Sequence, residues 1–222
     1  WRDRLAAGST LSEREGLALL ADYGIAVPRA QPVASRDEAI AAAGEIGFPV
    51  ALKTANPAIT HKSDQGGVVL GLRDAMALGA AYDAMVVRCG ADVLIAEMAQ
   101  EIVGSGVEIG LGAVDDPAFG PFVMVAAGGT LIELFRDSAV ALAPFGSDEA
   151  LALLQSLRIA PLLHAQRGRA AADLVRLAET IARFSLLAAD LAGAYSQIDV
   201  NPVIAGPRGA VAVDALIAGR AR

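Results

Sequence analysis

In some stretches of the chain apolar residues recur at the spacing of a helix, and in others they form short runs typical of strands. The two kinds of stretch alternate along the chain. Apolar residues at helical spacing follow Ser12 and Ser35, and each serine has a glutamate three residues later, which is the capping-box pattern of a helix start. We expect the first helix to end at Tyr23-Gly24 and the second near Gly47, because glycine commonly follows the last turn of a helix. The N-terminal quarter therefore predicts two helices.

Short apolar runs with strand character follow these helices. The pattern predicts strands over residues 48–53, 67–72 and 92–98, with an alanine-rich helix over 74–88 between the last two. The first of these strands ends in a lysine, Lys53.

The sequence pattern changes beyond Met98. Two runs with strand character, at 107–114 and 121–127, flank the turn-forming Asp115-Asp116-Pro117. We therefore expect an α+β fold of two lobes, residues 1–98 with a phosphate loop and 99–222 with a metal-binding hairpin, and a ligand site in the cleft between them. The further elements expected in the second lobe are strands near 131–135 and 139–143, helices over 147–157 and 170–191, and strands over 195–204 and 210–216.

Composition agrees with a globular protein. The 222 residues are 55% hydrophobic, which is enough to bury a core. The apolar residues are interrupted well before the roughly 18 consecutive positions that a membrane span needs, so no transmembrane helix is expected. The chain begins at Trp1 without an initiator methionine and without a signal-peptide pattern, which indicates an internal boundary and favours a cytoplasmic origin.

Net charge and cysteine content limit the kinds of partner and metal site that the chain can have. A net charge of -7 argues against sequence-independent binding to nucleic acid or to an anionic membrane. Cys89 is the only cysteine, which excludes an internal disulfide and an all-thiolate metal site, and its helical spacing predicts a small core residue. A small molecule or another protein is therefore the expected partner.

The segment between two of the predicted strands suits a phosphate group. It holds both lysines of the chain, Lys53 and Lys62, together with His61 and the pair Gly66-Gly67. Glycines let backbone N–H groups approach an anion, and ammonium groups bind phosphate oxygens. A neutral imidazole can also take a phosphoryl group if its other nitrogen is oriented by a hydrogen bond. The alternative is a polar hairpin loop with an exposed histidine, in which the glycines serve only the turn.

The C-terminal hairpin is a second candidate site. Period two places Asp199 and Asn201 on one strand face, and a turn at residues 206–209 sets a register in which Asn201 lies opposite Asp214. Such pairs have Cβ atoms about 4.5–5.5 Å apart, so two oxygen-bearing side chains can share one Mg²⁺. The alternative is that Asn201 ends a strand and Asp214 caps it or faces water.

Taken together these segments resemble the ATP-grasp domain of ADP-forming (NDP-forming) acyl-CoA synthetases, which is related to the β subunit of succinyl-CoA synthetase. The similarity runs from about residue 11 to residue 216, and the order and spacing of its markers are specific. The markers are Tyr23-Gly24-Ile25, residues 48–53, 61–68 and 116–121, Gly128-Gly129, Arg167-Gly168 and residues 198–202.

The resemblance implies roles for the nucleotide-binding residues. It implies that Lys53 contacts nucleotide phosphates and that the Gly66-Gly67 loop folds over them. It also implies that Glu97 and Met98 form an inter-lobe hinge that reads adenine through backbone groups, with Glu108 a candidate ribose contact.

The resemblance assigns the catalytic and metal residues as well. Asn201 and Asp214 match the family's Mg²⁺ ligands, and Asp199 matches an acid thought to meet the phosphohistidine. His61 matches the histidine regarded as a transient phosphoryl acceptor.

Two positions depart from the family pattern. The family usually has a glutamate where this chain has Gln197, so an acid role there is not expected. His164 has no catalytic counterpart, and we interpret it as structural or exposed.

The family's reaction converts acyl-CoA, ADP and phosphate into acid, CoA and ATP, or the reverse. Its CoA-binding (α-type) domains lie on another subunit or on another part of a fused polypeptide. The chain is therefore expected to be the nucleotide half of an acid–CoA ligase (ADP-forming) that uses ATP/ADP and Mg²⁺, incomplete without those domains and working in a hetero- or homo-oligomer. The alternatives are a non-catalytic ATP-sensing or scaffolding module, such as one fused to a protein acetyltransferase, and another ATP-grasp carboxylate ligase, which has no need for His61.

Overall fold

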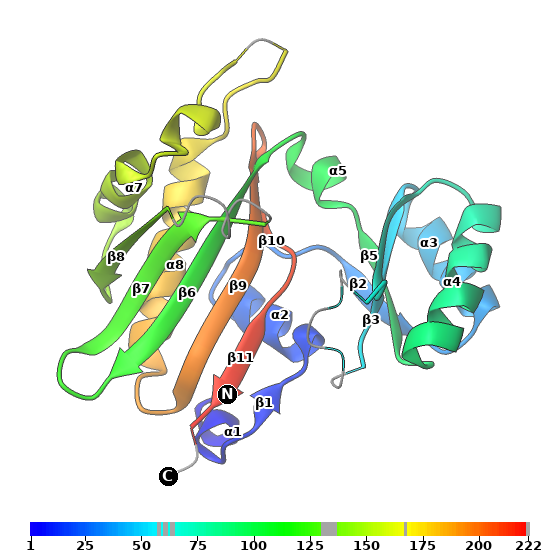
Figure 1. Ribbon diagram of the computed structural model, residues 1–222, viewed down its shortest axis with the longest axis horizontal. Helices are drawn as coiled ribbons and strands as arrows, with labels where there is room; N and C mark the ends of the chain where they lie inside the picture. Colours follow the sequence, from blue (N-terminus) through cyan, green and yellow to red (C-terminus); the bar gives the residue numbers. More distant parts are fainter. Residues whose placement is uncertain (57–58, 60–61, 63–64, 130–136, 167, 221–222) are drawn as a thin grey trace. The chain divides into compact units, whose positions relative to one another are not determined.

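The chain divides into two compact units (Figure 1), each of which is described by itself. The larger unit joins residues Trp1–Val27 to Val103–Arg222, and the smaller unit comprises Pro28–Ile102. The computed structural model describes residues 1–56, 59, 62, 65–129, 137–166 and 168–220.

The first 27 residues pack with the C-terminal part of the chain, whereas the sequence assigned them to an N-terminal lobe of residues 1–98. Strand β1 (Thr10–Leu11) pairs antiparallel with β11 (Leu216–Gly219), the last strand of the chain. The Tyr23 hydroxyl donates a hydrogen bond of 3.1 Å to Asp190 Oδ2. The boundary therefore differs from the expected one because contacts between distant parts of the chain leave no local pattern in the sequence.

The larger unit is built on a seven-stranded antiparallel sheet. The strand order is β1-β11-β9-β6-β7-β8, and β10 pairs with β9 beside this path. The additional strands are β6 (Val107–Asp116), β7 (Gly120–Ala127), β8 (Ser138–Leu142), β9 (Tyr195–Gly206) and β10 (Gly209–Ala212).

Helix α8 (Leu174–Asp190) covers one face of this sheet (Figure 1). Its stripe of Leu177, Ile181 and Phe184 is fully buried and belongs to the main core cluster. Along each strand, buried residues that face the core alternate with residues that point away from α8. Among the described residues, the other helical segments of the larger unit are α1 (Arg2–Ala6), α2 (Glu13–Asp22), α7 (Ser147–Ser156) and the 3₁₀ helix η1 (Ala160–Leu163).

The smaller unit is a four-stranded antiparallel sheet in the order β2-β5-β3-β4, with two helices packed on it. Its core includes Leu52, Leu78, Met85 and Ile95, and Cys89 is buried at the end of a helix as the sequence predicts. The elements are β2 (Ala30–Val33), α3 (Arg36–Ile46), β3 (Val50–Thr54), β4 (Val68–Leu72), α4 (Ala75–Cys89) and β5 (Val93–Glu97), followed by α5 (Ala99–Val103).

The predicted helix starts are confirmed. Ser12 Oγ accepts a hydrogen bond from the Glu15 N–H, and the Ser12 N–H donates to Glu15 Oε2 at 2.9 Å, which completes a capping box. Ser35 Oγ likewise accepts from the Glu38 N–H at 3.2 Å. The two helices end at Tyr23 and Gly47, as expected.

Most predicted strands are also confirmed to within a few residues. The exception is the run at 210–216, which forms two strands, β10 and β11, separated by residues 213–215. The strand expected near 131–135 lies outside the described residues. Within the ranges that the structure describes, none of the helices is long and apolar enough to cross a bilayer.

Candidate functional site

Lys53 lies on β3, the strand of the smaller unit that pairs with both β4 and β5. Its register partners are Val68 and Leu94, and the residue is only 8% exposed. Lysine is rarely this buried in a protein unless its ammonium group meets an oxygen partner. Lys53 is therefore held in a fixed place at the start of the loop that the sequence singled out.

The Gly66-Gly67 pair closes the base of this loop. The Gly67 N–H donates to Lys62 O at 2.6 Å, and the Thr54 N–H donates to Gly67 O at 2.7 Å. Gly66 has a φ of +65°, and a Cβ on Gly67 would lie 2.7 Å from Thr54 Cγ2. Position 66 therefore favours glycine because of its backbone conformation, and position 67 favours it because the Thr54 side chain lies so close. The hairpin-loop interpretation predicts such glycines, and a phosphate loop also needs them.

Lys53, Lys62, Gly66 and Gly67 are thus brought together in the smaller unit, at one end of β3 and β4. His61, the predicted phosphoryl acceptor, lies outside the described residues.

Glu97 and Met98 follow the end of β5. The Glu97 carboxylate forms an ion pair with Arg29, at 3.2 Å between Arg29 Nε and Glu97 Oε2, and the Glu97 N–H donates to Arg29 O. Met98 Sδ accepts a hydrogen bond from the Gly71 N–H at 3.4 Å. Arg29 is not predicted as a site residue from the sequence, since nothing local indicates that it meets a residue 68 positions away.

In the larger unit, the C-terminal strands keep the register expected from a turn at 206–209. Ala210 pairs with Ala205 on one side of the gap, and Leu216 pairs with Asp199 in the same register on the other side. Asp214 therefore stands opposite Asn201, as predicted. The ladder is interrupted there, and Asp214 Oδ1 accepts a hydrogen bond from the Ala215 N–H at 2.9 Å.

Asn201 is tied to the segment after β7. The Gly129 N–H donates to Asn201 Oδ1 at 3.0 Å, and the Gly128 N–H donates to Glu108 O at 2.8 Å. Gly129 has a φ of +57°, and a Cβ there would overlap the Glu108 carboxylate. The glycine pair therefore brings Glu108 and Asn201 to one place. The sequence offered Gly128-Gly129 only as a family marker.

The electrostatics of the hairpin suit a cation. Burial, followed by the charge of Asp214, raises the pKa of Asp199. In the part of the chain that the structure describes, no three His, Cys, Asp or Glu residues gather as a metal site. The side-chain oxygens of Asn201 and Asp214, with the Asp199 carboxylate beside them, could hold Mg²⁺, because this ion keeps several waters and takes further oxygens from phosphates.

The two other residues that the sequence singled out are both exposed. His164 is exposed just after η1, which agrees with the second of its two interpretations, structural or exposed. Gln197 is exposed on β9 and pairs with Ala218 of β11.

Comparison with known proteins places these residues in a family. The ATP-grasp domain family matches residues 4–218. The chain is 33% identical over 215 residues to the β subunit of acetate–CoA ligase (ADP-forming) I of Pyrococcus furiosus, covering 95% of this chain and 92% of that subunit. It is 35% identical over 207 residues to the 4-hydroxybutyrate–CoA ligase (ADP-forming) of Nitrosopumilus maritimus, but there it spans only 29% of the relative.

Solved structures agree with this assignment. The acetyl-CoA synthetase 1 of Ca. Korarchaeum cryptofilum, in complex with coenzyme A and Ca-AMPCP, superimposes with a TM-score of 0.88 at 33% identity, covering 95% of this chain and 93% of that one. A second structure of that enzyme, with coenzyme A and Mg-AMPPCP, has its phosphohistidine segment pointing towards the nucleotide-binding site and gives a TM-score of 0.82 at 34% identity, with the same coverage of both chains. The chain therefore belongs to the ATP-grasp domain family, in the group that includes the β subunits of ADP-forming acetate–CoA ligases.

Proposed function

We propose that the chain is the nucleotide-binding part of an ADP-forming acyl-CoA synthetase and moves a phosphoryl group between ATP or ADP and a histidine. The observation that carries this proposal is end-to-end similarity to separate β subunits, 92% and 93% of whose length the chain covers. The acyl-CoA/acid interconversion also needs CoA-binding domains, and these lie outside the residues of this chain. We place the reaction in the cytoplasm, where ATP, ADP and CoA are available.

The smaller unit carries the cationic residues of this proposal. Lys53 and Lys62 neutralise phosphate oxygens, and the glycine pair lets backbone N–H groups come close to them. Because the Glu97 N–H is already bonded to Arg29 O, adenine recognition falls to the Glu97 carbonyl and the Met98 N–H.

The larger unit carries the residues proposed to hold the metal. Asn201 and Asp214 hold Mg²⁺, which neutralises charge on the phosphates when it is bound. Glu108 accepts hydrogen bonds from ribose hydroxyls. Asp199 orients the histidine that exchanges the phosphoryl group, since a carboxylate can accept the proton of the second ring nitrogen.

The chemical step breaks the bond between the γ-phosphorus and the oxygen that remains with ADP, and it forms a bond from phosphorus to a nitrogen of His61. ADP leaves with the electron pair, and the second ring nitrogen carries the proton until a neighbouring base removes it. Positioning and charge neutralisation contribute most of the rate in reactions of this kind.

The test uses the fact that the chain has only two histidines, His61 and His164. We expect γ-labelled ATP with Mg²⁺ to leave an acid-labile label on the protein. The label should be lost in His61→Ala and kept in the matched control His164→Ala, because His164 is exposed and outside the proposed site. Binding of Mg-ATP by calorimetry without any label, even when the CoA-binding domains are present, would instead establish the non-catalytic sensing module.

A further inference from the structure

The sheet face of the larger unit that points away from α8 carries a concentration of exposed apolar side chains. On β7 and β8, large apolar side chains alternate with the core-facing positions at residues 122, 124, 140 and 142, and Val114 on β6 and Phe119 in the following turn are exposed beside them. We call this set the sheet-face patch; its members are Val114, Phe119, Phe122, Met124, Val140 and Leu142.

The strand register makes the patch continuous. Phe122 lies opposite Val114 on one side and Leu142 on the other, which forms one row across three strands. Met124 lies opposite Val140 in the next row on the same face. Val140 and Leu142 are 55% and 52% exposed, although both belong to a regular strand. An apolar surface that spans three neighbouring strands marks an interaction site more often than isolated exposed residues do.

The turn between β6 and β7 holds Phe119 at one end of the patch. Asp116 Oδ1 accepts hydrogen bonds from the N–H groups of Ala118 and Phe119 at 2.8 and 3.0 Å. The Phe119 ring is 71% exposed and packs edge-on against Phe122, with ring centroids 6.2 Å apart.

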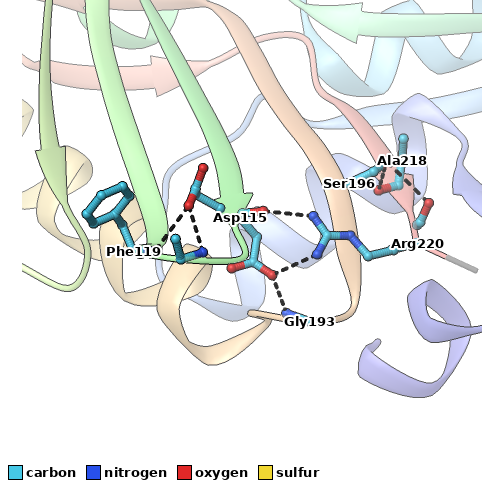
Figure 2. A network of polar contacts seen from close by, with 9 residues as sticks. Asp115, Phe119, Gly193, Ser196, Ala218 and Arg220 are labelled. Atoms are coloured by element: carbon cyan, nitrogen blue, oxygen red, sulfur yellow. Dashed lines mark hydrogen bonds and ion pairs between the residues drawn. The ribbon is translucent and has the colours of Figure 1, made fainter. Parts of the chain in front are cut away.

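Asp115 holds the other side of the same turn. Its Oδ2 accepts from the Gly193 N–H at 2.8 Å and pairs with Arg220 Nη1 at 3.2 Å, on the side away from the Phe119 ring (Figure 2). The turn is therefore fixed by polar contacts on one side and displays an aromatic ring on the other.

The patch leads directly to the candidate metal site. In the row of Met124 and Val140, the next position on β6 is Gly112, and the one after it on β9 is Asp199. Gly112 has no side chain, and the Met124 methyl group would lie 3.3 Å from a Cβ placed there. The apolar surface thus runs without a polar break from β8 to the carboxylate that we assign to the phosphoryl-transfer site.

We infer that the sheet-face patch is the docking surface for the CoA-binding part of the enzyme, an inference that rests on the proposed function. In the Nitrosopumilus maritimus relative, more than two thirds of the chain lies outside the region that this chain matches. In a Ca. Korarchaeum cryptofilum relative, the phosphohistidine segment reaches towards the nucleotide-binding site. A partner seated on this surface lies next to Asp199, the carboxylate that we assign to the phosphoryl-transfer site.

The first experiment uses single cysteines as accessibility probes, because the native Cys89 is buried. Val140→Cys is the probe, and Val87→Cys on α4, at a position that is 90% exposed in the other unit, is the matched control. Both variants are labelled with a maleimide, first in this chain alone and then in the native enzyme that contains the CoA-binding part. We expect labelling at position 140 to be slowed at least about tenfold in the native enzyme, while labelling at position 87 is unchanged.

The second experiment separates docking from nucleotide binding. In the native enzyme, Val140→Lys with Leu142→Lys should lower acyl-CoA formation at least about tenfold while Mg-ATP affinity stays within about twofold, because a buried charge without a partner weakens an apolar interface. Val87→Lys should change neither quantity.

Each other outcome overturns a defined part of the inference. Equal labelling at position 140 in an active enzyme would refute the docking surface and leave the proposed function standing. Concentration-dependent protection in this chain alone would assign the patch to a second copy of the chain and refute the CoA-binding partner. Failure of wild-type enzyme to bind Mg-ATP would refute the proposed function itself.

Discussion

The Gly129 N–H donates a hydrogen bond of 3.0 Å to the Asn201 side-chain oxygen, across 72 positions of sequence. This contact fixes which way the amide of Asn201 faces. A carbonyl oxygen has a second lone pair, so the bonded oxygen can still bind a cation. The segment after β7 is therefore a positioning element for the residue that we propose as a Mg²⁺ ligand.

The first prediction concerns Gly129→Ala. We expect Mg-ATP affinity, measured by calorimetry, to fall at least about tenfold, or about 1.4 kcal/mol, because the new methyl group overlaps the Glu108 carboxylate and pushes the segment away from Asn201. Gly120→Ala is the matched control, since Gly120 also has a positive φ but nothing lies within 4 Å of a Cβ placed there. Both variants carry the backbone cost of about 1 kcal/mol, so only the difference between them reports the overlap. Equal affinities would show that the segment does not position the site.

The second prediction concerns the metal side. Asp214→Asn should weaken ATP binding at least about tenfold when Mg²⁺ is present and leave metal-free binding nearly unchanged, because the proposed metal contact loses its charge. Asn201→Ala should weaken Mg²⁺-dependent binding at least as much, and it also removes the acceptor of the Gly129 N–H. Gln197→Ala is the control, as Gln197 lies on the same strand but is exposed and pairs with Ala218. A titration of Mg²⁺ at fixed ATP measures the effect. Loss of binding that does not depend on the metal would point to a structural role for the hairpin.

Local patterns were enough to predict much of this architecture. The capping box at Ser12, the Ser35 cap, the helix ends at Tyr23 and Gly47, and the register that sets Asn201 against Asp214 depend on residues close together in sequence or on a single hairpin turn. Such features follow from caps, turns and strand periodicity, which are properties of short segments.

Long-range contacts could not be predicted in this way. The pairing of β1 with β11 moves the first 27 residues into the larger unit, and only a partner about 200 residues away makes so short a strand stable. The same holds for Arg29 with Glu97 and for Gly129 with Asn201, whose local sequence gives no sign of the partner. The split of the run 210–216 into two strands has a different origin, since its residues are apolar enough to be continuous and the break falls where Asp214 leaves the ladder.

The third prediction tests the capping box of α2. The Ser12 backbone N–H, the Arg4 guanidinium and the Ser12 hydroxyl lower the pKa of Glu15 to about 2 from 4.5. A carboxyl whose pKa is lower in the folded state stabilises the fold above its unfolded pKa and loses this contribution as the pH falls. Glu15→Gln should therefore lower the melting temperature at neutral pH, and its difference from wild type should shrink as the pH falls from 4.5 to about 2.

The control for that experiment is Glu149→Gln. Glu149 occupies the first turn of α7, where the N-cap is Gly146, which has no side chain to form a capping box. Glu149→Gln should lower the melting temperature at neutral pH much less than Glu15→Gln does. Ser12→Ala should cost about 1 kcal/mol of unfolding free energy at neutral pH, as is typical for the loss of a helix cap. A wild-type level of stability in Glu15→Gln at neutral pH would contradict the assigned role.

The fourth prediction concerns Asp199, whose pKa is shifted in the opposite direction from that of Glu15. Burial and the neighbouring Asp214 raise the pKa of Asp199 above 3.8, so the folded state holds this proton more tightly than the unfolded state does. The stabilising contribution is complete below that value and is lost as the pH rises through the folded pKa. In the absence of Mg²⁺, Asp199→Asn should therefore be more stable than wild type at neutral pH and no different from it below 3.8.

Adding Mg²⁺ with ATP distinguishes a metal site from a merely unfavourable carboxylate. A cation beside Asp199 and Asp214 offsets their repulsion, so the melting temperature of wild type should rise by more than that of Asp199→Asn under the same conditions. Asp148→Asn, an exposed change on α7, serves as the control and should follow wild type with and without the ligand. An equal rise in wild type and in Asp199→Asn would mean that the bound metal does not relieve the charge of Asp199, and the raised pKa would then reflect burial beside Asp214 rather than a place in the phosphoryl-transfer site.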